Sequence, residues 1–346
     1  MGGGAPVRVQ SMTNTPTADA AATLAQIGSL AAAGCEIVRV ALPRADDTVA
    51  FAEIVRGSPL PVIADIHFDW RLALAALQAG AAGVRINPGT IGRPDGVRRI
   101  VEAAGDRGAA IRIGVNQGSL PRPLRTLAEQ DPARALVEAA TDYAARLDDW
   151  GFAAYKLSVK SSSVPVTVAA YRALADVCDA PLHVGVTEAG TRWRGTIKSA
   201  VGIGALLVDG IGDTIRVSLT ADPVEEVRVA WAILSALELR RRGPEVISCP
   251  TCARTEIDVV GLAEEVERRL QSDPRLAEAP LTVAVMGCSV NGPEEARHAD
   301  FGIAGGRGAG VVFAHGERVA MVPEERLVGE LFARVLATGV DGRAQS

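Results

Sequence analysis

The sequence predicts an α/β protein in which a (β/α)8 barrel is followed by a smaller α+β domain. From residue 7 to about 240, short β-branched segments alternate with longer segments rich in Ala and Leu, and many of these end at Gly. Strict β–α alternation gives a parallel sheet with right-handed crossovers, and about eight such units in this length fit a closed barrel. The alternative is an open doubly wound sheet. The absence of a Gly-x-Gly-x-x-Gly turn after the first strand disfavours it.

The chain of 346 residues is longer than one ordinary core, so two domains are expected. The segment Arg240-Arg241-Arg242-Gly243-Pro244 has the composition of a linker. We therefore predict a barrel over residues 1–240 and a second domain over residues 245–346.

The strands of the barrel are expected where β-branched residues cluster: Val7–Met12, Glu36–Leu42, Pro61–Ile66, Gly83–Pro88, Ala110–Asn116, Ala153–Lys160, Pro181–Thr187 and Asp213–Leu219. Helices lie between them. Four have Asp or Thr caps or an early Pro that mark their starts, namely Thr17–Ala33, Asp69–Ala79, Asp131–Trp150 and Asp222–Arg240.

The second domain combines strands and helices in a less regular order. A helix is predicted over Asp258–Leu270, with core positions Val260, Leu262, Val266 and Leu270. The other elements are strands at Val246–Ser248, Leu281–Met286 and Phe301–Ala304, a hairpin over Val311–Pro323 that turns at His315-Gly316-Glu317, and a last helix over Glu324–Ala337.

Composition excludes several classes of function. The chain is 48% hydrophobic and 22% charged, with a net charge of −5, which argues against general binding to nucleic acid or to a membrane surface. No apolar segment reaches transmembrane length, and the start Met1-Gly2-Gly3-Gly4 does not resemble a signal peptide. We expect a cytoplasmic protein. Because thiols stay reduced in the cytoplasm, the Cys-x-x-Cys pair of Cys249 and Cys252 then indicates metal or redox chemistry. Cys35 and Cys178 are expected to be small buried hydrophobic residues.

Charged residues stand at the ends of most predicted barrel strands. In a barrel, inward polar residues near the carboxyl ends of the strands line the active-site mouth. The cations outnumber the anions Asp65 and Glu188, and this surplus predicts an external anion such as a phosphate or diphosphate. A mutually satisfied ion-pair network is the alternative. The cations are Arg39, Arg85, Arg112, Lys156, Lys160 and Arg216, accompanied by the polar residues His67, Asn116, Ser158 and Ser218.

Three cysteines in the second domain predict a metal centre. Cys249 and Cys252 are separated by two residues, and Cys288 follows a predicted strand. Three thiolates with a nearby carboxylate suit an iron–sulfur cluster, although zinc with His298 or a carboxylate as fourth ligand also fits. From the residues alone, we predict a two-domain enzyme that binds a small phosphorylated compound and performs redox chemistry with a cluster.

Five motifs resemble one family closely and in order along nearly the whole chain, that of the bacterial 4-hydroxy-3-methylbut-2-enyl diphosphate synthases of the methylerythritol phosphate route to isoprenoids. The motifs are Gln10-Ser11-Met12-Thr13-Asn14-Thr15, Ile63-Ala64-Asp65-Ile66-His67-Phe68, Val84-Arg85-Ile86-Asn87-Pro88-Gly89, Ile247-Ser248-Cys249-Pro250-Thr251-Cys252-Ala253-Arg254 and Gly287-Cys288-Ser289-Val290-Asn291-Gly292-Pro293.

The resemblance implies a TIM barrel joined to a cluster domain related to sulfite and nitrite reductases. It implies a 4Fe–4S cluster held by Cys249, Cys252, Cys288 and Glu295. The reaction would be the two-electron ring opening and dehydroxylation of 2-C-methyl-D-erythritol 2,4-cyclodiphosphate to 1-hydroxy-2-methyl-2-butenyl 4-diphosphate. Glu188 would be the acid. Flavodoxin or ferredoxin would donate electrons to a head-to-tail homodimer. The substrate-binding residues would be Arg39, Asp65, His67, Arg85, Arg112, Asn116, Lys160, Arg216 and Ser218.

Two features depart from the family pattern. The usual Asn-Gly-Pro-Gly-Glu is Asn291-Gly292-Pro293-Glu294-Glu295 here, so Glu294 competes with Glu295 as a ligand. Family members also usually carry a longer segment before the first strand, so we expect this chain to be truncated there. The rival functions are a barrel phosphate-ester transferase with a structural zinc appendage and a cluster-bearing iron sensor.

Overall fold

The computed structural model describes residues 2–92, 94–288, 294 and 296–338. The chain divides into two compact units, Met1–Arg240 and Arg241–Ser346. Among the described residues, no helix is both long and apolar enough to cross a membrane.

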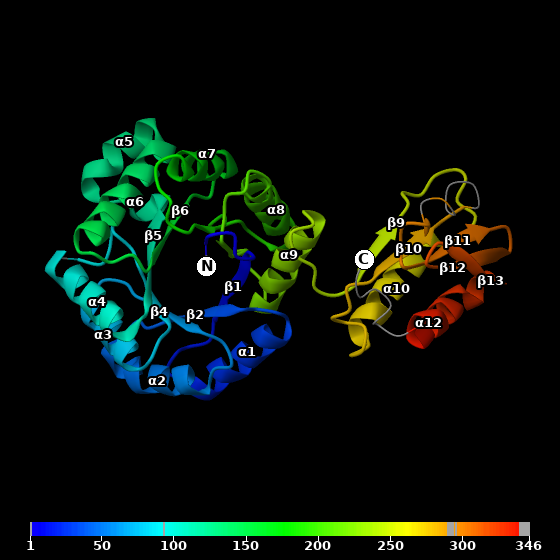
Figure 1. The fold of residues 1–346 in the computed structure, drawn as a ribbon, viewed down its shortest axis with the longest axis horizontal. Coiled ribbons are helices and arrows are strands. Elements are labelled where there is room, and N and C mark those ends of the chain that lie inside the picture. Colours follow the sequence, from blue (N-terminus) through cyan, green and yellow to red (C-terminus); the bar gives the residue numbers. More distant parts are fainter. Residues whose placement is uncertain (1, 93, 289–293, 295, 339–346) are drawn as a thin grey trace. The chain divides into compact units, whose positions relative to one another are not determined.

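The first unit is a barrel of parallel strands surrounded by helices (Figure 1). The sheet order is β6-β5-β4-β3-β2-β1-β8-β7, and a parallel bridge between Leu157 and Leu182 joins the two ends of the sheet. The predicted barrel is therefore confirmed over the open sheet. Its strands are β1 (Arg8–Met12), β2 (Ile37–Ala41), β3 (Val62–Asp65), β4 (Gly83–Ile86), β5 (Ala110–Asn116), β6 (Tyr155–Lys160), β7 (His183–Val184) and β8 (Thr214–Ile215).

The helices bury one face each against these strands, as Ile27 and Leu30 of α1 do. Their starts follow the predicted caps at Asp69, Asp131 and Asp222, whose carboxylates accept from backbone N–H groups of the first turn. The helices are α1 (Ala20–Ala32), α2 (Thr48–Gly57), α3 (Trp70–Gln78), α4 (Pro94–Arg107), α5 (Arg125–Gln130), α6 (Pro132–Asp149), α7 (Val164–Ala175), α8 (Arg192–Val208) and α9 (Pro223–Ala236).

The predicted start of the first helix at Thr17 is wrong. Asp19 is the cap, because its carboxylate accepts from Ala22 N at 2.9 Å. The Thr17 hydroxyl instead donates to Ala41 O at 2.6 Å, so it ties the loop to the neighbouring strand β2.

The last two strands are shorter than predicted. β7 ends at Val184 and β8 at Ile215, whereas the sequence suggested Thr187 and Leu219. Beyond β8 the backbone leaves the ladder, since Leu219 N donates to the Glu226 carboxylate at 3.0 Å instead of to a strand.

The assignment of Arg240 to the last barrel helix is also wrong. Helix α9 ends at Ala236, and Glu238 adopts a left-handed conformation with φ of 55°. The Arg240 guanidinium donates to Val7 O at 2.6 Å and to Glu36 at 2.7 Å, and it stacks over Trp231. Arg240 is thereby fixed to the barrel.

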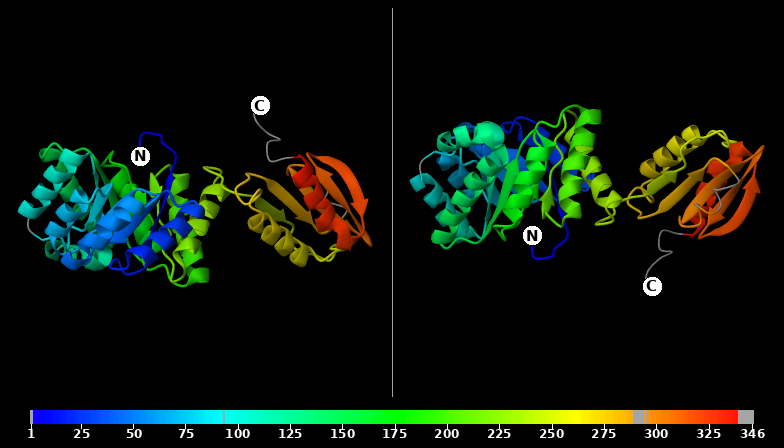
Figure 2. Two further views of the ribbon diagram at one scale, coloured as in Figure 1. Left: turned by 90° about the horizontal axis from the view of Figure 1, so that it is seen from below. Right: turned by 90° about the horizontal axis from the view of Figure 1, so that it is seen from above.

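The second unit is a mixed sheet with the order β13-β12-β11-β10-β9 (Figure 2). Strand β10 runs parallel to its neighbours β9 and β11, whereas β12 runs antiparallel to its neighbours β11 and β13. Helix α10 (Val259–Ser272) packs on β9 and β10, and α12 (Leu327–Thr338) packs on β11 and β12. The strands are β9 (Glu245–Ser248), β10 (Thr282–Met286), β11 (Phe301–Gly306), β12 (Ala309–Ala314) and β13 (Glu317–Val322).

Most predictions for this unit are confirmed, including the turn at His315–Gly316, whose φ angles of 51° and 81° are those of a tight hairpin. One predicted core residue is wrong. Val260 is 56% exposed, while Val259 is buried, because Val259 lies two turns before Val266 on the buried face of the helix and Val260 does not. β11 also extends to Gly306, two residues beyond the predicted end, because Gly306 pairs with Ala309 in the next strand.

Candidate active site: a buried cationic centre in the barrel

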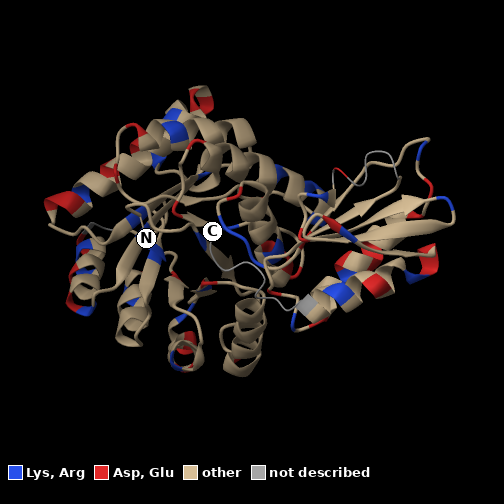
Figure 3. Ribbon diagram, turned by 45° about the vertical axis from the view of Figure 1, so that its right-hand side comes forward, with Lys and Arg blue, Asp and Glu red and all other residues tan. Residues whose placement is uncertain are grey.

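Charged side chains form a row across neighbouring strands of the barrel. The strand registers pair Asp65 with Arg85, Arg85 with Arg112, and Arg112 with Lys156. Figure 3 shows blue segments on strands inside the ring of helices. Five of the predicted cations, Arg39, Arg85, Arg112, Lys156 and Lys160, are buried, with exposed fractions of 9%, 4%, 3%, 6% and 8%. The strand-end position predicted for Lys156 is wrong, because it is the second residue of β6. The predicted inward orientation is confirmed for these residues.

Asp65 is the anion at the centre of this row. Its Oδ1 lies 3.2 Å from Arg85 Nη1, and its Oδ2 lies 3.8 Å from Arg39 Nε and 3.6 Å from His67 Nε2. Burial acts to raise the pKa of Asp65, but Arg39, the His67 hydrogen bond and Arg85 together hold that pKa well below its usual range. The carboxylate is therefore ionised and holds the two arginines in place.

Arg85 is held on both of its terminal nitrogens. Besides Asp65, its Nη1 contacts His67 Nε2 at 2.9 Å, and its Nη2 donates to Gly114 O at 3.0 Å. In the amide orientation that satisfies both ends, the Asn116 oxygen accepts from Arg85 Nη2 at 3.3 Å. A Cβ at position 114 would lie 2.4 Å from Arg85 Nε, so only glycine leaves room for the guanidinium here.

Some guanidinium nitrogens of the centre have no hydrogen-bond partner among the described residues. Arg112 Nε and Nη1 and Arg85 Nε are buried without a hydrogen bond. Burial, followed by the neighbouring arginines, lowers the pKa of Lys160 well below its ordinary value. Burial and then Arg112 lower the pKa of Lys156 to about 7. Unpartnered donors and crowded like charges are the signature of a site that awaits an anionic ligand.

His183 was not singled out from the sequence, yet it faces the same centre. It is fully buried, its Nδ1 lies 2.8 Å from Thr214 Oγ1, and its Nε2 has no described partner. Burial, and then Lys160, Arg112 and Lys156, lower the pKa of His183 well below its ordinary value, so the ring is neutral. A lone His in a short strand gave no signal in the sequence.

Glu226 was also missed. It lies in the first turn of α9, where acidic residues are ordinary, so nothing in the pattern separated it from its neighbour Glu225. Its buried carboxylate lies 3.3 Å from Arg216 Nη2 and accepts from Ser11 Oγ at 3.1 Å. Ser218 is half-buried and lies between Arg216 and Leu219.

The centre thus combines six cations with two buried carboxylates, Asp65 and Glu226. Each carboxylate engages arginine, but cations remain in excess. The alternative of a fully compensated ion-pair network is therefore not supported by the described contacts.

Glu188 lies outside this buried group. It is exposed, adopts a left-handed φ of 51°, and makes no side-chain hydrogen bond or ion pair with another described residue.

The cysteines of the second unit emerge from neighbouring parallel strands. Cys249 follows β9 and Cys288 follows β10, so both leave the same edge of the sheet. Gly287 N donates to Cys249 Sγ at 3.2 Å, a hydrogen bond typical of thiolate ligands. Cys252 is exposed, and hydrogen bonds from Arg254 lower the pKa of its thiol. This donor set fits an iron–sulfur group.

Glu295, the predicted fourth ligand, lies outside the described residues. Glu294 is exposed, and its Oε2 pairs with Arg297 Nη2 at 3.2 Å. Within the described part of the chain, no three His, Cys, Asp or Glu side chains gather as a metal site, and His298 is exposed. Cys35 is buried as predicted, and burial raises the pKa of its thiol to about 11, while Cys178 is only half-buried.

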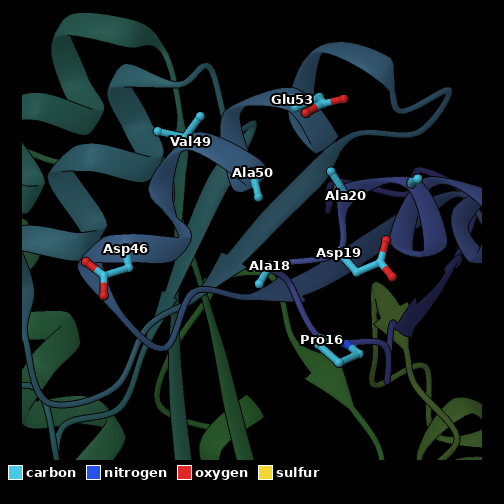
Figure 4. Close-up of a pocket in the computed structure, with 9 residues that line it drawn as sticks. Pro16, Ala18, Asp19, Ala20, Asp46, Val49, Ala50 and Glu53 are labelled. Atoms are coloured by element: carbon cyan, nitrogen blue, oxygen red, sulfur yellow. The ribbon is translucent and has the colours of Figure 1, made fainter.

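A separate groove lies on the surface between the starts of α1 and α2 (Figure 4). Its walls include Pro16, Asp19, Asp46, Val49 and Glu53. None of the predicted site residues lines it.

Comparison with known proteins assigns the class first. Residues 1–231 match the family model described as the GcpE TIM-barrel domain, and residues 245–337 match the GcpE protein C-terminal domain. The fold and these matches define a TIM-barrel protein with a GcpE-type C-terminal domain.

The relatives identify the family. A protein of Geobacter sulfurreducens named 4-hydroxy-3-methylbut-2-en-1-yl diphosphate synthase (flavodoxin) is 56% identical over 97% of this chain and 94% of its own length. Proteins of the same name from Maridesulfovibrio salexigens and Salinispora tropica are 54% and 55% identical, covering 97% of this chain and 93% and 85% of their own lengths. The chain belongs to the family of 4-hydroxy-3-methylbut-2-en-1-yl diphosphate synthases, which are iron–sulfur oxidoreductases. The transferase and iron-sensor alternatives find no support.

Proposed function

We propose that the barrel of this synthase binds 2-C-methyl-D-erythritol 2,4-cyclodiphosphate and that the second unit supplies the electrons that convert it to the linear diphosphate. The observation that carries the proposal is the group of buried cations on β2, β4, β5 and β6, in which Arg85 and Arg112 keep guanidinium nitrogens without a described hydrogen-bond partner. Arginine and lysine donors of this kind bind the oxygens of a diphosphate.

The reaction is balanced by two electrons and one proton. The bond between C2 and the ring phosphate oxygen breaks, the neighbouring hydroxyl leaves as water, and a double bond forms. The diphosphate gains one negative charge as the ring opens. A pocket with excess positive charge therefore stabilises the later stages of the reaction more than the substrate.

Two kinds of residue share the anion site in this proposal. Arg39, Arg112, Lys160, Arg216 and Ser218 contact the diphosphate directly. Asp65, His67 and Asn116 hold Arg85 and Arg39 in register by the contacts described above, so that their free donors face the ligand.

The cluster would be held by Cys249, Cys252, Cys288 and Glu295, and we infer the 4Fe–4S type. When bound, it supplies single electrons to the substrate. The thiolates are supported by the Gly287 hydrogen bond to Cys249, and the choice of Glu295 over Glu294 is supported by the pairing of Glu294 with Arg297.

Glu188 is proposed as the acid that protonates the departing hydroxyl. It follows β7, at the carboxyl ends of the strands where barrel enzymes place catalytic groups. Its exposed carboxyl is free of other described contacts, so it can approach a ligand without breaking an ion pair.

The electron donor and the assembly are further parts of the proposal. The relatives' names carry flavodoxin, so we infer flavodoxin or ferredoxin as the external donor. A head-to-tail homodimer is expected, which sedimentation of the holoprotein checks. We infer a cytoplasmic location, because free thiols persist in reducing compartments.

Anaerobic purification followed by reductive turnover tests the proposal. The protein should carry about four irons and acid-labile sulfide per chain, and it should convert the cyclodiphosphate when reduced. Glu188→Gln should retain its iron and lose at least about a hundredfold in turnover, the usual contribution of a general acid. Stoichiometric zinc in place of iron would contradict the proposal, as would full turnover by the Glu188 variant.

A further inference from the structure

Arg216 is held at only part of its guanidinium. Its Nη2 lies 3.3 Å from both carboxylate oxygens of Glu226, whereas its Nε is buried without a described partner. The side chain is 20% exposed, so it borders the open part of the centre. One end of the guanidinium is thus fixed and another is left for a ligand.

The Glu226 carboxylate binds three donors that come from two separate segments of the barrel. Besides Arg216, its carboxylate accepts from Ser11 Oγ of β1 at 3.1 Å and from Leu219 N of the loop after β8 at 3.0 Å. Its side chain is 5% exposed, so this is not a solvent-screened surface pair. A buried carboxylate with this many donors has one fixed position.

The surroundings of Arg216 explain why such a carboxylate is needed. Arg216 acts electrostatically on both Arg39 and Lys160, lowering the pKa of each after the larger effect of burial. Without a counter-charge, like charges would push Arg216 towards solvent. The Glu226 carboxylate opposes that repulsion at Arg216, and it also acts to raise the pKa of Arg39.

The same carboxylate fixes the backbone next to Ser218. Because Leu219 N and Arg216 Nη2 both bind it, the segment 216–219 is held at two points around one anchor. Arg216 and Ser218 are the two site residues on this segment, and neither belongs to a strand.

We propose that Glu226 is a positioning residue for the diphosphate site. It presents Arg216 and Ser218 to the ligand without touching the ligand itself. This inference rests on the proposed function of the barrel centre and adds a residue that the sequence pattern did not single out.

The test compares Glu226→Gln with its neighbour Glu225→Gln. Glutamine keeps an acceptor for Leu219 N but removes the charge that holds Arg216. Glu225 pairs with Arg192 and Arg228 on the outer side of the same helix turn, so it is a matched control. Glu226→Gln should raise KM for the cyclodiphosphate about tenfold, the size expected for a lost charge-assisted contact, with kcat and iron content nearly unchanged.

A second readout does not depend on turnover. Inorganic diphosphate should raise the Tm of the wild-type holoprotein, and this rise should shrink by at least about half in Glu226→Gln but not in Glu225→Gln. In an Arg216→Ala background, Glu226→Gln should have no further effect on KM, since the two residues act as one unit.

Unchanged KM in Glu226→Gln, or effects that add to those of Arg216→Ala, would overturn the proposal. If Glu226→Gln fails to fold, Ser11→Ala serves in its place, because it removes one donor and keeps the charge. It should raise KM about twofold to threefold, and an unaltered KM there counts against the proposal. Failure of the wild-type protein to turn over the cyclodiphosphate would instead refute the proposed function.

Discussion

At the scale of single residues, the centre is dominated by the cost of burying like charges. Lys156 and Arg112 stand opposite each other on neighbouring strands, and both are buried. Asp65 and Glu226 pair directly with Arg85 and Arg216, two negative charges among six cations. The remaining repulsion among the buried cations lowers the stability of the ligand-free protein. A bound anion relieves this repulsion, which contributes to its affinity.

This cost predicts a pH dependence of stability in the ligand-free, metal-free protein. Lys156 has a pKa of about 7 when folded, below its value in the unfolded chain. Between pH 7 and 8.5 the unfolded chain therefore binds more protons, and the free energy of unfolding should rise with pH. The slope contributed by Lys156 is at most about 1.4 kcal/mol per pH unit.

Urea unfolding at several pH values in this window measures the slope. Lys156→Met should flatten it, because the variant has no proton to lose on folding. Lys198→Met, in helix α8, is the control and should keep the wild-type slope. Equal slopes in wild type and Lys156→Met would show that burial of this ammonium costs nothing.

At the scale of elements, the site depends on glycines in or next to the barrel strands. A Cβ at Gly114 of β5 would lie 2.4 Å from Arg85 Nε. At Gly185, just after β7, it would lie 2.8 Å from Lys160 Nζ and 2.4 Å from Arg216 O. The two glycines make space for cations that come from neighbouring strands.

Gly114→Ala should therefore displace Arg85 from Asp65 and weaken binding of inorganic diphosphate by about tenfold. Isothermal titration of the holoprotein measures the affinity. Gly118→Ala, in the short turn directly after the same strand, is the control, because a Cβ there meets no atom within 4 Å. An affinity in Gly114→Ala equal to that in the control would contradict the role of this space.

At the scale of the whole molecule, the two units have separate hydrophobic cores. One core surrounds the barrel strands, and the other joins Val266, Leu270, Phe301 and Leu331 of the second unit. The predicted anion-binding residues belong to the first unit, and the three predicted cluster cysteines belong to the second. We therefore expect that a substitution can abolish iron binding without abolishing diphosphate binding.

Cys249→Ala tests this separation in the full chain. The variant should lose most of its iron and its turnover, while the rise in Tm caused by inorganic diphosphate stays within about a degree of that in wild type. Iron analysis and thermal unfolding provide the two measurements. Loss of the diphosphate effect together with iron would mean that the anion site needs the cluster.

The sequence by itself determined the barrel, most strand and helix limits, and the inward cations. Alternation of apolar and helical segments and polar residues at strand ends are local patterns, and the strand period of two places Arg112, Gly114 and Asn116 on one face. Recognition of Cys249, Cys252 and Cys288 also required only their spacing and neighbours.

Only the tertiary structure decided which groups compensate those cations. Glu226 lies 215 residues from its donor Ser11, and His183 lies 31 residues from Thr214. Their roles arise when the closing of the barrel brings β1, β7 and β8 together, and no local pattern encodes that contact. The backbone N–H of Leu219, beyond the end of β8, is likewise bound by the buried carboxylate of Glu226, a contact that no local pattern predicts.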